Sequence, residues 1–108
     1  PDWTNEVTFR DMADYNVINN EAQQQFEIEL QGEKAYLSYR FYKADVALMH
    51  TYVPPPLEGK GVAAALAKAA FAWARASQKL VMIYCPYVAA FVQRHPEYRS
   101  YLDPQYLG

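Results

Sequence analysis

Two glycines, Gly59 and Gly61, stand between an apolar run that ends at Val53 and a long alanine-rich segment with helical periodicity. Prolines directly after Val53 stop the apolar run, because proline cannot donate to a sheet ladder. Glycine lets a backbone approach a bulky anion, and the free N–H groups and dipole of a helix start favour negative charge. This order of strand, glycine turn and helix indicates a phosphate site. The alternative is a glycine turn that binds nothing, since such turns are common before helices.

Cys85 is the residue with the strongest chemical argument. A free thiol has a pKa of about 8.5, and the N-terminus of a helix lowers it. The sequence places Cys85 at the end of a predicted strand and just before a predicted helix. His50, on a neighbouring predicted strand, is a candidate base for this thiol, so the pair indicates a nucleophile or an acid–base group. The alternative is a small buried apolar residue at a strand end, which free cysteine often is.

The first half of the chain contains the elements that would position His50. Residues 1–20 are polar with little periodicity, and we expect surface loops there, with Trp3 and Phe9 as candidate contacts to the body. Beyond them, apolar and polar residues alternate as in half-buried strands, and short turns separate the segments. We therefore expect an antiparallel three-strand meander over residues 25–30, 34–41 and 46–53.

The second half positions Cys85. A helix is predicted from about Glu58 or Gly61 to Ser77, followed by the continuous apolar run Leu80–Tyr84, which is typical of a buried strand. With the helix as a crossover, this fourth strand should lie parallel to the third. A short second helix is expected over residues 88–94. One face of the long helix carries Val62, Leu66, Ala69, Ala70 and Trp73.

Composition limits the classes of function. A chain of 108 residues with 52% hydrophobic and 20% charged residues is expected to form one globular α+β domain over residues 1–108, with its core over about 17–102. A net charge of −2 gives no electrostatic reason to expect nucleic acid or an anionic membrane as a partner. One cysteine and two separated histidines predict neither an internal disulfide nor a metal site. The chain shows no signal segment and no bilayer-spanning run, so we expect a cytoplasmic protein.

Several motifs agree in order and spacing with a known superfamily. The order of the predicted elements resembles the core of the GNAT superfamily of N-acetyltransferases, and residues 58–63 resemble its Gln/Arg-x-x-Gly-x-Gly/Ala signature, with Glu58 in place of Gln or Arg. The chain is most similar in type to the small, stand-alone GNAT-like proteins, over residues from about 17 to 102. The supporting segments are residues 19–23, 26–30, 53–61, 85–91 and 94–98.

This resemblance implies a site for acetyl-CoA between the third and fourth predicted strands. It implies that the pantetheine arm lies along the third strand and that backbone amides of the glycine turn hold the pyrophosphate. Cys85 and His50 would lie near the acetyl thioester, and Tyr84 and Tyr87 are further candidate proton donors. The implied cofactor-binding residues are His50, Thr51, Val53, Gly59, Lys60, Gly61, Val62 and Ala63.

Two classes of function follow from the resemblance. The first is an N-acetyltransferase that transfers the acetyl group of acetyl-CoA to an amine, directly or through Cys85. The second is a non-catalytic module that binds CoA or acyl-CoA, or that contacts another protein. Only the turn at Gln31–Glu33 joins the first two predicted strands, where GNAT enzymes usually have helices that form the acceptor wall. An open acceptor side fits a large or protein-borne amine, or no acceptor.

Overall fold

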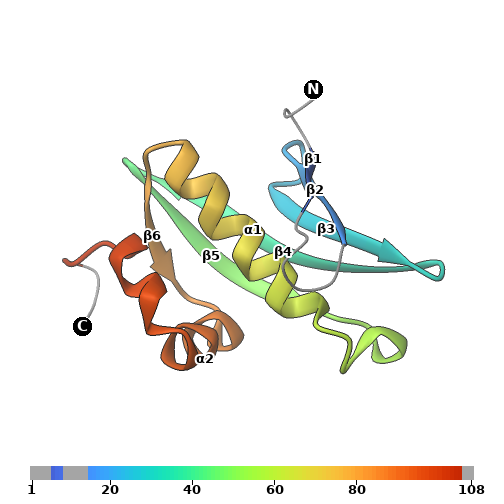
Figure 1. The fold of residues 1–108 in the computed structure, drawn as a ribbon. Helices are drawn as coiled ribbons and strands as arrows, with labels where there is room; N and C mark the ends of the chain where they lie inside the picture. Colours follow the sequence, from blue (N-terminus) through green and yellow to red (C-terminus); the bar gives the residue numbers. More distant parts are fainter. Residues whose placement is uncertain (1–5, 9–14, 106–108) are drawn as a thin grey trace.

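The computed structural model describes the backbone of residues 6–8 and 15–105, with side chains from residue 15 onward. Its strands form one six-stranded sheet in chain order, and only the last pair, β5 and β6, runs parallel (Figure 1). The strands are β1 (Glu6–Thr8), β2 (Asn16–Asn20), β3 (Gln25–Leu30), β4 (Glu33–Tyr42), β5 (Asp45–Tyr52) and β6 (Leu80–Ile83). The helices are α1 (Val62–Ala76), α2 (Pro86–Arg94) and the short 3-10 helices η1 (Pro55–Leu57) and η2 (Pro96–Tyr101).

The α+β class and the predicted order of elements are confirmed. The meander is β3, β4 and β5, and the fourth predicted strand, β6, pairs in parallel with β5 from Asp45↔Leu80 to Leu48↔Ile83. Helix α2 begins at Pro86, two residues earlier than expected. Proline suits the first position of a helix because its fixed φ is helical and its missing N–H would have no partner there.

The expectation of loops over residues 1–20 is wrong for β1 and β2, which extend the predicted four strands to six. In β2 the buried side chains are Val17 and Asn19, whereas Ile18 is exposed. Asn19 is thus a polar residue in a buried position, and Ile18 is an apolar residue in an exposed position. For this reason the sequence of β2 does not show the apolar–polar alternation of a half-buried strand. The Tyr39 hydroxyl donates a hydrogen bond of 2.8 Å to Asn19 Oδ1, which satisfies this buried amide oxygen. The expected contacts of Trp3 and Phe9 lie outside the described residues.

The added strand β2 also introduces a connection that the sequence did not predict. A turn of residues 21–24 joins β2 to β3. Its last residue, Gln24, has a φ of 55° and accepts a hydrogen bond of 2.9 Å from the Tyr39 amide. The connection is therefore a tight turn held against β4, and it contains no helix.

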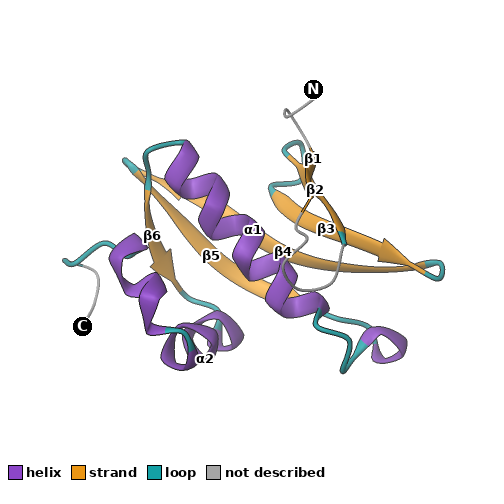
Figure 2. Ribbon diagram, viewed as in Figure 1, coloured by secondary structure: helices purple, strands orange, loops and turns teal. Residues whose placement is uncertain are grey.

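Helix α1 lies across one face of the sheet, as Figures 1 and 2 show. Its predicted apolar face is confirmed, since Val62, Leu66 and Ala70 are at most 1% exposed. Small alanines let the helix approach the sheet closely, and Trp73 packs its ring 5.5 Å from Phe26. Among the described residues, no helix combines the length and apolar character needed to cross a bilayer.

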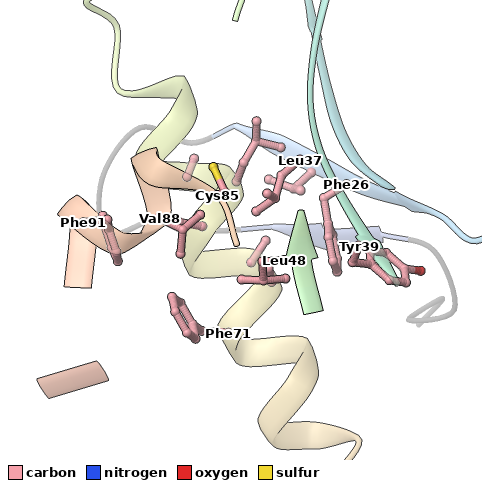
Figure 3. Close-up of a cluster of buried hydrophobic side chains, with 14 of the residues drawn as sticks. Phe26, Leu37, Tyr39, Leu48, Phe71, Cys85, Val88 and Phe91 are labelled. Carbon is pink, nitrogen blue, oxygen red and sulfur yellow. The ribbon is translucent and has the colours of Figure 1, made fainter. Parts of the chain in front are cut away.

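Helix α2 covers the same face of the sheet as α1. The rings of Phe71 in α1 and Phe91 in α2 stack with their centroids 6.4 Å apart. Figure 3 shows Val88 and Cys85 in the same apolar cluster as Leu48. Over β3, β4 and β5, no described helix covers the opposite face, which we call the open face.

Candidate functional site

The sheet opens between β5 and β6, directly after Leu48. The carbonyl oxygen of Leu48 accepts two hydrogen bonds, from the amides of Tyr84 at 2.9 Å and Cys85 at 3.1 Å. The parallel pairing ends there, so residues 49–52 of β5 have no described strand beside them on the β6 side. An unpaired strand edge offers backbone N–H and C=O groups to an extended ligand.

A bulge in β5 sets which side chains face this opening. Ser38 pairs with His50 and Tyr39 with Leu48, which leaves Met49 as an extra residue on β5. Strict alternation from Leu48 would direct His50 toward the helices, but one extra residue reverses the faces beyond it. Thr51 therefore faces the helices, and His50 lies on the open face.

The Cys85 thiol consequently contacts Thr51. The Thr51 Oγ1 and Cys85 Sγ atoms lie 3.1 Å apart, and either can donate the hydrogen bond. Cys85 is only 2% exposed, whereas the exposed His50 packs its ring 6.1 Å from that of Tyr36 on the open face. We expected His50 near the thiol, but the bulge places Thr51 there instead.

A cavity of about 230 Å³ lies at the end of the opening. It is bounded by Val53 just after β5, the segment that leads into α1, the first turn of α1, and Tyr87 from α2. The lining residues are Val53, Leu57, Glu58, Gly59, Gly61, Val62, Ala63, Ala64 and Tyr87. The structure thus brings together most of the residues predicted to bind the cofactor, whereas His50, Thr51 and Lys60 do not line this cavity.

The glycine turn has the geometry of an anion cradle. Gly59 and Gly61 both have φ of 77°, a left-handed conformation that glycine adopts without steric cost. Gly61 is the N-cap of α1 and has no side chain to occupy the first-turn N–H groups, and no acidic residue follows in that turn. The helix itself offers these amides no acceptor. The residues present therefore fit a bound phosphate group, with the Glu58 carboxylate as the one unfavourable charge in the lining.

The glycine turn is also tied to the start of β2. The Tyr15 hydroxyl donates a hydrogen bond of 2.6 Å to the Lys60 carbonyl oxygen. Sequence reasoning missed Tyr15 because it lies in a polar segment without periodicity, and the contact spans 45 positions. The Lys60 side chain is exposed.

Tyr87 is the candidate proton donor that the structure places in the cavity wall. Burial raises the pKa of its hydroxyl, although the nearby Arg94 lowers it in part. The Tyr87 hydroxyl therefore keeps its proton at neutral pH and can donate it. Tyr84, the other candidate, is 51% exposed and does not line the cavity. Among the described residues, no three His, Cys, Asp or Glu side chains are grouped as a metal ion would require.

Sequence comparison agrees with this geometry. The family model described as GCN5-related N-acetyl-transferase matches residues 25–101, from the first residue of β3 to the end of η2. The chain therefore belongs to the GCN5-related N-acetyltransferase (GNAT) family, as the sequence motifs indicated.

The chain is also similar to curated proteins of comparable length. It is 35% identical to Protein NATD1 of Danio rerio over 94 residues, which cover 84% of this chain and 80% of that protein. It is 33% identical to Protein NATD1 of Mus musculus over 93 residues, 82% of this chain and 84% of that protein. The Homo sapiens protein of the same name is also 33% identical over 93 residues, 82% of each chain. The chain is thus similar to small GNAT-like proteins.

Proposed function

We propose that this protein is an acetyl-CoA-dependent N-acetyltransferase. The observation that carries the proposal is that a left-handed glycine turn and the first turn of α1 line one cavity together with Val53, which directly follows the unpaired end of β5. An anion-binding helix start beside an open strand edge suits a ligand with a phosphate end and an extended, amide-containing arm. Membership of the GNAT family supports the same ligand.

The proposed binding residues follow from this arrangement. Backbone amides of Gly61, Val62 and Ala63 hold the pyrophosphate, and the left-handed turn at Gly59 brings the chain close to it. Thr51 lies where β5 lacks a neighbour, Val53 directly follows that strand, and both would line the pantetheine arm.

The chemistry needs a proton acceptor for the amine and a proton donor for the departing sulfur. When bound, acetyl-CoA supplies a thioester whose carbonyl carbon an amine can attack. His50 lies on the open face and can accept the amine proton there. Tyr87 holds a proton at its hydroxyl in the cavity wall and can donate it to the sulfur. The burial of Cys85 against Thr51 favours direct attack by the amine over transfer through the cysteine sulfur.

The test is calorimetric titration with acetyl-CoA of the parent chain and of Gly61→Trp, which fills the cradle. Gly32→Trp is the matched control, because Gly32 has φ of 76° and open surroundings like Gly61, but lies in the β3–β4 turn away from the cavity. Both substitutions introduce the same backbone strain. We expect micromolar binding by the parent and the control and none by Gly61→Trp.

Absence of binding by the parent would refute the proposal and leave a protein-interaction module. Binding without turnover in a screen of amine acceptors would instead indicate a non-catalytic CoA-binding module.

A further inference from the structure

Large hydrophobic side chains gather on the side of the sheet that includes the open face. Among the described residues, six large hydrophobic side chains are exposed, and alternation along the strands directs four of them to this side. These four are Ile18 in β2, Tyr42 in β4, Tyr52 in β5 and Leu80 in β6. A sheet face with several exposed hydrophobic side chains is typical of a surface that packs against another molecule.

Aromatic rings occupy the middle of the open face. Tyr36 in β4 lies directly opposite Tyr52 in β5, with the ring centroids 5.7 Å apart. The ring of the exposed His50 lies 6.1 Å from that of Tyr36. Tyrosine provides a large contact area and loses little conformational entropy when it is buried, so it is favoured at the centre of an interface. The middle of the open face is therefore suited to burial.

The carboxylate of Glu27 on this face is already paired within the chain. It accepts hydrogen bonds from Gln25 at 2.7 Å and Asn20 at 2.9 Å, and the Lys34 ammonium lies 3.5 Å away. Burial raises the pKa of the Glu27 carboxyl, but these contacts outweigh it and hold the pKa below its usual value. Glu27 and Lys34 therefore satisfy each other's charge without a partner molecule.

Two further charges lie at opposite ends of the open face. Glu29 in β3 and Arg40 in β4 are both exposed there, and within the part of the chain that the structure describes neither forms an ion pair. Glu29 pairs in register with Lys34, and Arg40 lies six positions beyond Lys34 on β4, so the two charges are about 20 Å apart along the strands. The rings of Tyr36 and Tyr52 lie between them.

This arrangement of charges and rings is complementary to itself. A two-fold axis that crosses β4 between Tyr36 and Ser38, perpendicular to the strands, would place Glu29 of each copy over Arg40 of the other. The tyrosine rings of both copies would meet near the axis. Stacked sheets lie about 10 Å apart, a distance that long glutamate and arginine side chains can span together. The open face thus fits a second copy of itself in the antiparallel orientation.

We propose that the open face binds the open face of a second copy of this chain, and that two ion pairs between Glu29 and Arg40 close this two-fold dimer. An area of about four strands by seven residues is roughly 500 Å² per copy, so dimerisation would bury about 1,000 Å² in total. This area is at the low end for a specific interface, and we expect a reversible dimer with a Kd of about 10–100 μM. The inference does not depend on acetyl-CoA binding. The dimer would cover His50, so transfer by the proposed function would require the monomer.

Sedimentation equilibrium of the full chain at about 1–300 μM measures this association, and we expect the parent to change from monomer to dimer over that range. Glu29→Arg and Arg40→Glu should each weaken dimerisation by about tenfold, because each substitution places like charges together twice. An equimolar mixture of the two variants should restore dimerisation, since every ion pair then joins opposite charges. Glu97→Arg and Arg99→Glu are the matched controls, because they make the same charge changes at exposed residues of η2 on the helix side.

A parent chain that stays monomeric at all concentrations would overturn the inference and leave the open face to a different molecule. Dimerisation that both charge reversals leave unchanged would also overturn it, because the contact would then involve another surface. Two variants that lose dimerisation and do not recover it on mixing would refute the two-fold pairing of Glu29 with Arg40. Circular dichroism verifies that each variant is folded, and Glu29→Lys and Arg40→Asp replace a variant that is not.

Discussion

The hydroxyl of Tyr15 and the carbonyl oxygen of Lys60 are joined by a hydrogen bond of 2.6 Å that ties the start of β2 to the glycine turn. In a trans peptide the C=O of one residue and the N–H of the next point in opposite directions. By holding the Lys60 carbonyl, Tyr15 therefore also fixes the direction of the Gly61 N–H, which borders the cavity.

We predict that Tyr15→Phe weakens acetyl-CoA binding by about two- to tenfold, the value of one neutral hydrogen bond. Binding of S-acetylpantetheine, which lacks the pyrophosphate, should not change, and calorimetry measures both. Tyr42→Phe, which removes a hydroxyl far from the turn, is the control. An equal loss for both ligands would show that Tyr15 supports the fold and not the phosphate cradle.

Glu58 should oppose the binding of phosphate, since it lines the cavity where the family signature has Gln or Arg. We predict that Glu58→Gln tightens acetyl-CoA binding by about two- to threefold at low salt, a modest gain because this carboxylate is exposed. Titrations at two salt concentrations measure the gain, which should shrink at high salt. Glu21→Gln, in the β2–β3 turn, is the control, and an unchanged affinity in Glu58→Gln would mean that its carboxylate turns away from the phosphates.

Cys85 should contribute more to stability than to transfer. Replacing a buried thiol with a smaller group leaves a space, so Cys85→Ala should lower the free energy of unfolding by about 1–2 kcal/mol. Urea titration measures this loss, with Ala89→Gly, an exposed change in α2, as a comparison for helix stability. The folded variant should keep most of its transferase activity. Loss of all activity, with acetyl-Cys85 found by mass spectrometry in the parent, would establish transfer through the sulfur.

Acid should destabilise the protein through Glu27. Its folded-state pKa lies below the reference value of 4.5, so the folded state favours the carboxylate form. The stability from this group is therefore fully present above the unfolded-state pKa and is lost as the pH falls through the lower folded-state pKa. We predict that Glu27→Gln flattens the decline of stability below about pH 4.5, measured by urea titration across pH. Glu29→Gln, a change at an exposed residue on the same strand, should leave the decline of stability as steep as in the parent. Equal curves of unfolding free energy against pH for Glu27→Gln and the parent would contradict the prediction.

Local sequence patterns predicted much of this fold and the glycine turn that leads into α1. Alternation identified the meander, and the prolines and glycines after Val53 marked the cradle. The pattern failed where distant residues decide the structure: Asn19 in β2 is buried because Tyr39, twenty positions away, binds its side chain. The hydrogen bond between Tyr15 and Lys60 likewise joins residues that are far apart in the sequence.

The placement of His50 could not be predicted because of one backbone irregularity. Strict alternation would direct His50 and Leu48 to the same face of β5, and His50 was a candidate base for Cys85 because it lies on the neighbouring strand. The extra residue at Met49 reverses the faces, and no local sequence signal marks a bulge of this kind. The sequence could thus name candidate residues for the site but not assign them to the two sides of the sheet.

The parallel pairing of β5 with β6 has a consequence for the order of folding. The antiparallel hairpins of β3, β4 and β5 close over short turns, whereas the pairing of Leu80 with Asp45 closes a longer loop that contains α1. Long-range closures of this kind carry a larger entropic cost and form late. The cavity beside the glycine turn needs the segment after β5, α1 and α2 together, so we expect it to be assembled late in folding. A nascent chain that has not yet released β6 and α2 from the ribosome would therefore lack the site that we propose for acetyl-CoA.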